Sequence, residues 1–320
     1  MLRKRVDHAL TISLKTGLIE CSDYSVVHAR GLIKRQGYLV IKTAAYFPLQ
    51  SALNAKPVLS AVCTSMVWNG ITMQKDSMDS DCAVIWSVLW HGRMKQNRHV
   101  YEHYRSLGRP VIVIDVGYLQ RGVTWRIGVN HINRQADFGD HRNLDPDRPA
   151  KLGVTLKQAD KHPEILIALQ HSRSLQTESM EDTATWALQK IRQIRQYSDR
   201  PIVIRPHPRD RVIIDNLPNG VRVEHPRRLA DTYDSYDWND RYHAVINHNS
   251  GPGVLAAIAG VRPVVDESSL AWPVSVSMAD IEKSYSQDRR QWLIELSHYE
   301  YTVPEIESGV WLKKLECSLS

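Results

Sequence analysis

The sequence lacks the patterns that mark membrane-spanning, secreted and disulfide-bonded proteins. No stretch approaches the roughly 18 apolar residues needed to cross a bilayer, and the basic start of the chain has no apolar run followed by a cleavage site. The four cysteines form no CxxC pair, which argues against a disulfide framework and a zinc knuckle. They are Cys21, Cys63, Cys82 and Cys317. We therefore expect a cytoplasmic protein with no membrane span.

Metal-binding patterns are also scarce, although the chain has 14 histidines. No HExxH sequence is present, and His99 with His103, at the i and i+4 spacing of a helix, is a weak signal by itself. We expect neither a bound metal nor a cofactor.

Length and composition predict two globular domains. The chain of 320 residues is about twice as long as a usual domain, and its 42% hydrophobic and 24% charged residues are ordinary globular values. The apolar-poor stretch 134–151 is typical of a linker, or alternatively of a mobile active-site loop. A linker there divides the chain into domains over residues 1–150 and 151–320. The net charge of +6 permits a polyanionic partner without requiring one.

Short apolar runs alternate with longer amphipathic stretches, the pattern of parallel sheets covered by helices. In the first half we expect strands over 37–42, 58–62, 83–87 and 111–117 and a helix over 93–106. In the second half we expect strands over 165–169, 202–204, 221–224, 244–247 and 261–266 and helices over 181–197 and 254–259. The tail is expected to be helical and to cross back onto the first domain. The sequence thus predicts an α/β protein with two Rossmann-like domains facing a cleft.

One informative stretch is AVINHNSGPGVLAAIAGVRPVVD, residues 244–266, in which a buried strand leads through a small-residue turn into a helix. Free N–H groups and the helix dipole favour an anion at such a turn, and Gly251 and Gly253 allow a ligand to approach the backbone. Ser250, beside Asn249, either caps the helix or turns its hydroxyl to a phosphate. A plain helix cap would use the same residues.

A second informative stretch is IVIRPHPR, residues 202–209, which places His207 between two prolines, with Arg205 and Arg209 nearby. Open α/β sheets bind ligands at the carboxyl ends of their strands, and guanidinium groups match phosphate oxygens. A single His-Pro pair is more typical of an ordinary loop. Because it is paired here with the glycine-rich turn, we expect His207 and Ser250 to converge on one anion from neighbouring crossover units.

These two motifs carry a resemblance to known enzymes. RPHP followed by NHNSGPGVLAAIAGVRPVV resembles the donor-binding half of bacterial capsule-type and sialyltransferase-like glycosyltransferases of the GT-B fold, in which an HP motif and a serine motif hold the donor phosphates. Residues 111–138 resemble a block in bacteriophage glycosyltransferases, some of which modify hydroxymethylated pyrimidines in DNA. The resemblance implies a nucleotide diphosphate sugar as donor, and we expect a UDP-sugar. The D/E-D/E-G acceptor motif of the sialyltransferases is missing, which argues against a sialic acid donor.

Sugar transfer requires removal of a proton from the acceptor hydroxyl. Asp115, which ends the strand VIVID, is the candidate base, and His91 in the turn WHGR is the reserve candidate. A turn carboxylate explains Asp115 equally well. In a retaining enzyme the donor phosphate would take the proton and Asp115 would position the acceptor. Tyr118 and Arg121 follow Asp115 and are expected to shape the acceptor wall.

Other residues are candidates for binding donor or acceptor. Asp266 ends a late strand and is expected to bind the donor ribose, and Trp272 is a candidate for stacking on a base or sugar, although packing explains it as well. Asn130, Asn133 and Arg134 suit acceptor contacts, although such residues in polar loops are usually solvated.

A DNA acceptor requires the target base to leave the stack and basic groups to hold the phosphates. Basic residues of the first half are candidates, although such runs are commonly solvated faces: Arg3, Lys4, Arg5, Arg93, Lys95, Arg98, Arg134 and Arg142. The leading prediction is transfer of a sugar from a UDP-sugar to a hydroxymethylated pyrimidine, such as hydroxymethylcytosine, in double-stranded phage DNA in the host cytoplasm. The alternatives are a capsular or lipid-linked saccharide acceptor, or a nucleic-acid-binding protein that has lost turnover.

Overall fold

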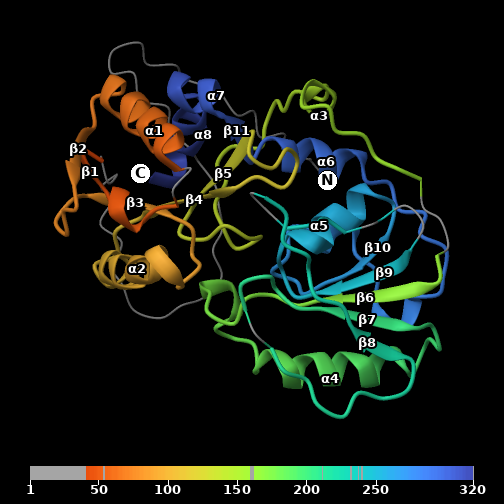
Figure 1. The fold of residues 1–320 in the computed structure, drawn as a ribbon. Coiled ribbons are helices and arrows are strands. Elements are labelled where there is room, and N and C mark those ends of the chain that lie inside the picture. The colour runs from red at the N-terminus through yellow and green to blue at the C-terminus, as the bar shows by residue number, and fades with distance from the viewer. Residues whose placement is uncertain are drawn as a thin grey trace, which may run out of the picture. The chain divides into compact units, whose positions relative to one another are not determined.

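The computed structural model describes residues 41–319 except 53–54, 159–161, 211, 231–232, 237 and 239–240. Within these residues the chain forms two β-sheets with helices packed on them (Figure 1). The predicted α/β class with two parallel-rich sheets is confirmed. Most of the strand predicted over 37–42, and the basic residues Arg3, Lys4 and Arg5, lie outside the described residues.

The first sheet has six strands in the order β11-β5-β4-β3-β1-β2. The strands β1 to β4 pair in parallel, whereas β5 pairs antiparallel with both β4 and β11. Their bounds are β1 Thr43–Tyr46, β2 Thr72–Lys75, β3 Cys82–Trp86, β4 Val111–Val116, β5 Thr124–Val129 and β11 Glu300–Thr302. The helices between them are η1 Pro48–Gln50, α1 Lys56–Trp68, η3 Gly92–Gln96 and α2 Asn97–Ser106.

One predicted strand of the first half is wrong. Residues 58–62 lie in α1, with Pro57 in its first turn. Five apolar or small residues in a row fit a buried helix as well as a strand, because a helix packed on a sheet buries much of its circumference. The predicted helix over 93–106 corresponds to η3 followed by α2, and β2 and β5 were not predicted.

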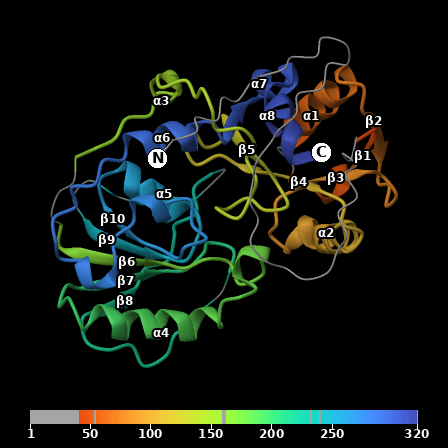
Figure 2. The same cartoon turned by 180° about the vertical axis from the view of Figure 1, so that it is seen from behind.

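The second sheet has five strands in the order β10-β9-β6-β7-β8, all parallel. Its strands are β6 Glu164–Ala168, β7 Ile202–Arg205, β8 Val221–Val223, β9 Tyr242–Asn247 and β10 Arg262–Val264. The central strands β6, β7 and β9 are buried on both faces and rich in Ile and Val, as parallel strands covered by helices must be. The helices α4 Thr183–Ile194 and α5 Gly251–Ile258 lie on opposite faces of this sheet (Figure 1 and Figure 2).

The remaining elements are short helices in connections and a C-terminal group. They are α3 Arg148–Lys151, η4 Leu175–Thr177, η5 Trp272–Val274, η6 Met278–Asp280, α6 Arg290–Ser297, α7 Val303–Ser308 and α8 Val310–Leu319. The tail returns to the first sheet, because β11 pairs with β5 and the buried Trp311 of α8 donates its indole N–H to Ser65 of α1. The domain boundary at residues 150 and 151 remains a prediction. Within the described residues, no helix is long and apolar enough to cross a membrane.

Candidate functional site

The carboxyl edge of the second sheet brings the predicted donor-binding segments together. The register aligns Ala168 of β6 with Arg205 of β7 and with Asn247 of β9, so the loops after these strands begin at one level. His207 and Ser250 therefore lie at the same edge. They do not come from adjacent strands, because β6 runs between β7 and β9, and two strand spacings amount to about 10 Å.

The turn around Ser250 is held by an amide network. Ser250 begins α5 without capping it, and its hydroxyl accepts a hydrogen bond of 3.0 Å from Asn247 Nδ2. Asn249 is buried, with its Oδ1 bound to Gln170 Nε2 at 2.8 Å and its Nδ2 bound to Ser268 Oγ at 2.8 Å. Asn249 thus builds the turn, and Asn247 orients the hydroxyl of Ser250, which also donates to Asn247 Oδ1 at 3.3 Å.

Packing leaves little room for a side chain at the two glycines of this turn. A Cβ on Gly253 would lie 2.6 Å from Cγ1 of Val265, and a Cβ on Gly251 would lie 3.0 Å from Cε1 of Tyr118. Gly253 therefore allows α5 to approach the chain after β10. Gly251 allows the predicted acceptor residue Tyr118, from the edge of the first sheet, to rest on the start of α5.

Three imidazole rings form a row that joins the edges of the two sheets. The ring of His171, after β6, has its centroid 5.1 Å from that of His207 and 4.8 Å from that of His91, after β3. Burial, together with the nearby His171, Arg209 and Arg121, lowers the pKa of His207 to about 3. Burial also lowers the pKa of His171, so both rings are neutral near pH 7.

Backbone hydrogen bonds hold this row in place. The N–H of Trp90 donates to the carbonyl of Arg173 at 2.9 Å, and the N–H of Leu175 donates to the carbonyl of Val88 at 3.0 Å. The loop after β6 therefore lies against the loop after β3. His171 was missed in the sequence, although its position directly behind the strand ILIAL is the same signal that singled out His207.

The other predicted donor-binding residues differ in what they can contact. Arg205 is 3% exposed, its Nη2 binds Asp234 at 2.9 Å, and its guanidinium lies over the ring of Tyr236. Arg209 is exposed, and its backbone N–H donates to His207 Nδ1 at 3.2 Å. Burial opposes ionisation of Asp266, but hydrogen bonds from the N–H and hydroxyl of Ser268 leave the pKa of its carboxyl below the ordinary value.

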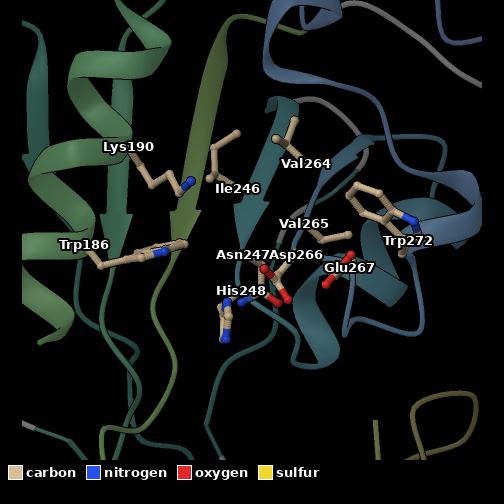
Figure 3. Close-up of a pocket in the computed structure, with 10 residues that line it drawn as sticks. All are labelled: Trp186, Lys190, Ile246, Asn247, His248, Val264, Val265, Asp266, Glu267 and Trp272. Atoms are coloured by element: carbon tan, nitrogen blue, oxygen red, sulfur yellow. The ribbon is translucent and has the colours of Figure 1, made fainter. Parts of the chain in front are cut away.

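A pocket of about 300 Å³ opens beside Asp266 (Figure 3). Ile246 and Val264 line it from the sheet. Trp186 and Lys190 of α4 flank it on one side and Trp272 on the other. His248, Asp266 and Glu267 lie together at one end, at the carboxyl edge of the strands. Burial lowers the pKa of Lys190, whose ammonium lies 5.6 Å from the centre of the Trp186 ring. Trp186 and Lys190 were not predicted, because their spacing on an amphipathic helix does not show which face they occupy.

The candidate base Asp115 lies at the carboxyl end of β4 and is half-buried. Its Oδ2 accepts a hydrogen bond of 3.2 Å from the hydroxyl of Ser87, which follows β3. Ser87 has a φ of 61°, in the left-handed region that residues other than glycine rarely adopt. Strained backbone of this kind is concentrated at functional sites, which supports a role for the pair.

The turn after Asp115 is anchored from the C-terminal strand. The buried carboxylate of Glu300 accepts hydrogen bonds from the backbone N–H groups of Tyr118 and Leu119 and, at 2.6 Å, from the hydroxyl of Thr124. The guanidinium of Arg126 lies 3.6 Å from the centre of the Tyr118 ring. Tyr118 is therefore fixed, whereas Arg121 at the tip of the turn is exposed.

The side chains of the predicted acceptor residues Asn130 and Asn133 form hydrogen bonds to nearby backbone N–H groups. Asn130 has a φ of 64° and accepts a hydrogen bond from the N–H of Val111, at the end of β4 opposite to Asp115. Asn133 is buried and accepts a hydrogen bond from the N–H of Gln135. Only Arg134 reaches the segment beside the pocket, donating from its backbone to the carbonyl of Ser268 at 2.9 Å and from Nη1 to that of Glu267 at 3.1 Å.

The described residues contain no group of three or more His, Cys, Asp or Glu side chains arranged to hold a metal ion. His103, one of the histidines considered for a metal, forms a hydrogen bond of 2.8 Å from Nε2 to the carbonyl of Met78.

No protein-family model matches this chain, and no curated protein sequence matches it either. Among solved structures, it is similar to the beta Kdo 2,4 transferase KpsC of Thermosulfurimonas dismutans, with 9% sequence identity and a TM-score of 0.47 over 81% of this chain and 90% of that one. It is also similar to the glycosyltransferase SnogD of Streptomyces nogalater, with 11% identity and a TM-score of 0.24 over 88% of this chain and 100% of that one. Neither similarity assigns a role to a residue of this chain.

Proposed function

We propose that the protein is a glycosyltransferase that binds a nucleotide sugar at the carboxyl edge of the second sheet. The observation that carries the proposal is the pocket between Trp186 and Trp272, which opens at the same edge as His207 and Ser250. Its volume of about 300 Å³ suits a nucleoside. A pocket for a base beside donors for a phosphate is the combination that a nucleotide requires.

The nucleoside end of the donor is assigned to the pocket. The indoles of Trp186 and Trp272 offer aromatic faces for the base, because base stacking on aromatic side chains is favourable for every base. Asp266 and Glu267 are placed to accept hydrogen bonds from the ribose hydroxyls. The ammonium of Lys190 adds a positive charge to the same pocket. We propose a UDP-sugar as the donor.

The phosphates are assigned to the neighbouring loops. The start of α5 offers free N–H groups and the positive end of the helix dipole, with the Ser250 hydroxyl beside them. His207 accepts the N–H of Arg209 at Nδ1, so its proton lies on Nε2 and is available to a phosphate oxygen. The exposed guanidiniums of Arg209 and Arg121 supply positive charge, whereas Arg205 is bound to Asp234 and has a structural role.

The transfer step is assigned to the edge of the first sheet. Asp115 takes the proton of the acceptor hydroxyl while the acceptor oxygen bonds to the sugar, and the bond between the sugar and the phosphate breaks. The departing phosphate keeps the bonding electron pair, and the groups around α5 stabilise its charge. Ser87 orients Asp115 through its hydrogen bond, and Tyr118 forms the wall between donor and acceptor. The ring of His91 contacts that of His171. We therefore assign His91 to the surroundings of the phosphates and not to the acceptor hydroxyl.

The acceptor that we propose is a saccharide hydroxyl. Two of the cations considered for a DNA backbone are engaged within the protein, since Arg98 pairs with Glu102 at 2.7 Å and Arg142 pairs with Asp140 at 2.8 Å. A hydroxymethylated pyrimidine in DNA is the second candidate, supported by the net charge of +6 and by the resemblance of residues 111–138 to phage enzymes.

The proposal is tested by incubating the protein with a panel of nucleotide sugars, alone and with acceptors. Release of the free nucleotide measures cleavage of the donor. Capsular oligosaccharides and hydroxymethylcytosine-containing DNA are the two acceptor arms, followed by mass spectrometry of the glycan or of the nucleosides. An enzyme acting on DNA loses affinity steeply as salt rises, whereas one acting on a glycan does not. If no nucleotide sugar is bound or cleaved while DNA is bound, the protein is a nucleic-acid-binding protein and the proposal is wrong.

A further inference from the structure

His171 presents a hydrogen-bond donor that the protein itself does not use. The side chain is 3% exposed, and its Nδ1 accepts the backbone N–H of Arg173 at 3.1 Å. The proton of the neutral ring therefore lies on Nε2. That atom is buried and has no hydrogen-bond partner among the described residues. Buried polar atoms without a partner are rare, and at the edge of a ligand-binding sheet they point to a missing ligand.

His207 repeats the same local arrangement on the adjacent strand. Its Nδ1 accepts the N–H of Arg209, just as Nδ1 of His171 accepts the N–H of Arg173. The loops that carry the two histidines follow β6 and β7, which are paired in parallel. The ring centroids lie 5.1 Å apart at an angle of 69°. Two imidazoles with the same tautomer therefore lie side by side, each with its acceptor nitrogen already occupied.

The free positions on these rings restrict the chemistry of the ligand. A hydroxyl group is both donor and acceptor, whereas phosphate oxygens at neutral pH are predominantly acceptors. Only Nε2–H donors remain on the two rings, so the ligand that they match must offer acceptors. The oxygens of one phosphoryl group lie close enough together to reach two neighbouring donors.

The surroundings of the two rings agree with an anionic ligand. Burial lowers the pKa of both rings and keeps them neutral, which avoids repulsion between two imidazolium ions in contact. The charged groups that face the pair are the guanidiniums of Arg173, Arg209 and Arg121 and the carboxylate of Asp210, with His91 on the other side of His171. The carboxylate of Asp210 is engaged by the N–H of Ser172 at 2.6 Å. Positive groups thus outnumber the single carboxylate.

We infer that His171 is a second phosphate-binding residue, which donates from Nε2 to the same phosphoryl group as His207. This inference rests on the proposed function, because that function supplies the phosphorylated ligand. The inference adds His171, which belongs to no motif in the sequence, to the residues of the proposed phosphate site. It also places the phosphoryl group at the ends of β6 and β7, beside the turn of Ser250 rather than on top of it.

Two substitutions separate the hydrogen bond from the packing of the ring. His171→Asn keeps an acceptor for the N–H of Arg173 but has no donor at the position of Nε2, whereas His171→Gln places an amide N–H near that position. Titration calorimetry with UDP and with uridine then measures the phosphate contribution. A hydrogen bond to a charged group contributes about 1.5–3 kcal/mol, which corresponds to a loss of UDP affinity of about 10- to 150-fold in His171→Asn.

The controls keep the outcomes distinct. Uridine affinity should stay unchanged in His171→Asn, His171→Gln should recover part of the UDP affinity, and His207→Asn should lose a similar factor. His99→Asn, on the exposed face of α2, should behave as the unmodified protein. If UDP and uridine bind but His171→Asn binds UDP normally, the inference is wrong and the proposed function stands. If UDP does not bind, pyrophosphate is the probe: loss of its binding in His171→Asn supports the inference without the proposed function, and absence of binding overturns both.

Discussion

The contact between Gly251 and Tyr118 allows a sharp test of what the glycine-rich turn is for. In Gly251→Ala the added methyl group would lie 3.0 Å from Cε1 of Tyr118, about half an ångström inside an ordinary contact. Tyr118 cannot yield easily, because Arg126 covers its ring and Glu300 binds its backbone N–H. The methyl group points at Tyr118, so the N–H groups of α5 that we propose bind phosphate should remain accessible.

The expected magnitude combines two opposing effects. Overpacking of this kind costs about 1–3 kcal/mol, whereas replacing glycine by alanine in a helix gains up to about 1 kcal/mol. Gly251→Ala should therefore lower the free energy of unfolding by about 0–3 kcal/mol. The displaced Tyr118 wall should lower turnover at saturating donor, while the Kd for UDP stays within about twofold, because the donors to the phosphate are unchanged.

The assay is urea unfolding together with steady-state kinetics on Gly251→Ala, Tyr118→Ala and the double variant. In the double variant the clash is absent, so a coupling energy of about 1 kcal/mol should separate it from the sum of the single variants. The reasoning is refuted if Gly251→Ala weakens UDP binding tenfold or more while turnover is unchanged. That result would mean that the glycine serves the approach of the ligand, as the sequence alone had suggested.

Three further predictions follow from the site. Asp115→Asn should lower turnover by about 100-fold or more and leave the Kd for UDP unchanged, as measured by steady-state kinetics and calorimetry; an unchanged turnover would exclude Asp115 as the base. Trp272→Ala should weaken uridine and UDP by the same factor, about 5- to 150-fold, because stacking on a base contributes about 1–3 kcal/mol; a loss confined to UDP would place the indole at the phosphates. The third concerns pH: the pKa of His207 falls from 6.5 unfolded to about 3 folded, so the unfolded chain binds the extra proton between these values. Stability should therefore decrease as the pH falls below 6.5, with His207 contributing up to about 2 kcal/mol by pH 5. His171 and His243, whose pKa values burial also lowers, act in the same direction. In urea unfolding His207→Asn should depend less steeply on pH, and an equal slope would contradict the burial of a neutral ring.

Much of the second sheet could be predicted because its strands are buried on both faces. The apolar runs that became β6, β7 and β9 are short, and each is bounded by polar or glycine-containing turns. The same reasoning failed for residues 58–62, since the apolar residues of α1 are close enough together to imitate a strand. A short apolar run indicates that its residues are buried. It does not show whether they form a helix or a strand, because the hydrogen-bond partner of a strand lies elsewhere in the chain.

The candidate site was also predicted only in part, because side-chain contacts, like strand pairing, depend on segments distant in the chain. His207, Ser250 and Asp115 could be picked out because each lies at or just after the carboxyl end of an apolar strand, and the carboxyl ends of parallel strands in one sheet share an edge. What each side chain contacts could not be predicted: Arg205 is bound to Asp234, and Asn130 accepts a hydrogen bond from the N–H of Val111. Such pairings depend on long-range contacts that leave no local pattern.

The sequence by itself determined the α/β class, most strands of the second sheet and the loops where chemistry is expected, because burial and turn formation are local properties of residue order. Only the tertiary structure decided that β6 lies between β7 and β9, that His171 therefore joins His207 and His91, and that Trp186 faces Trp272 across a pocket. Strand order and helix orientation result from packing between segments distant along the chain, and they decide which side chains meet.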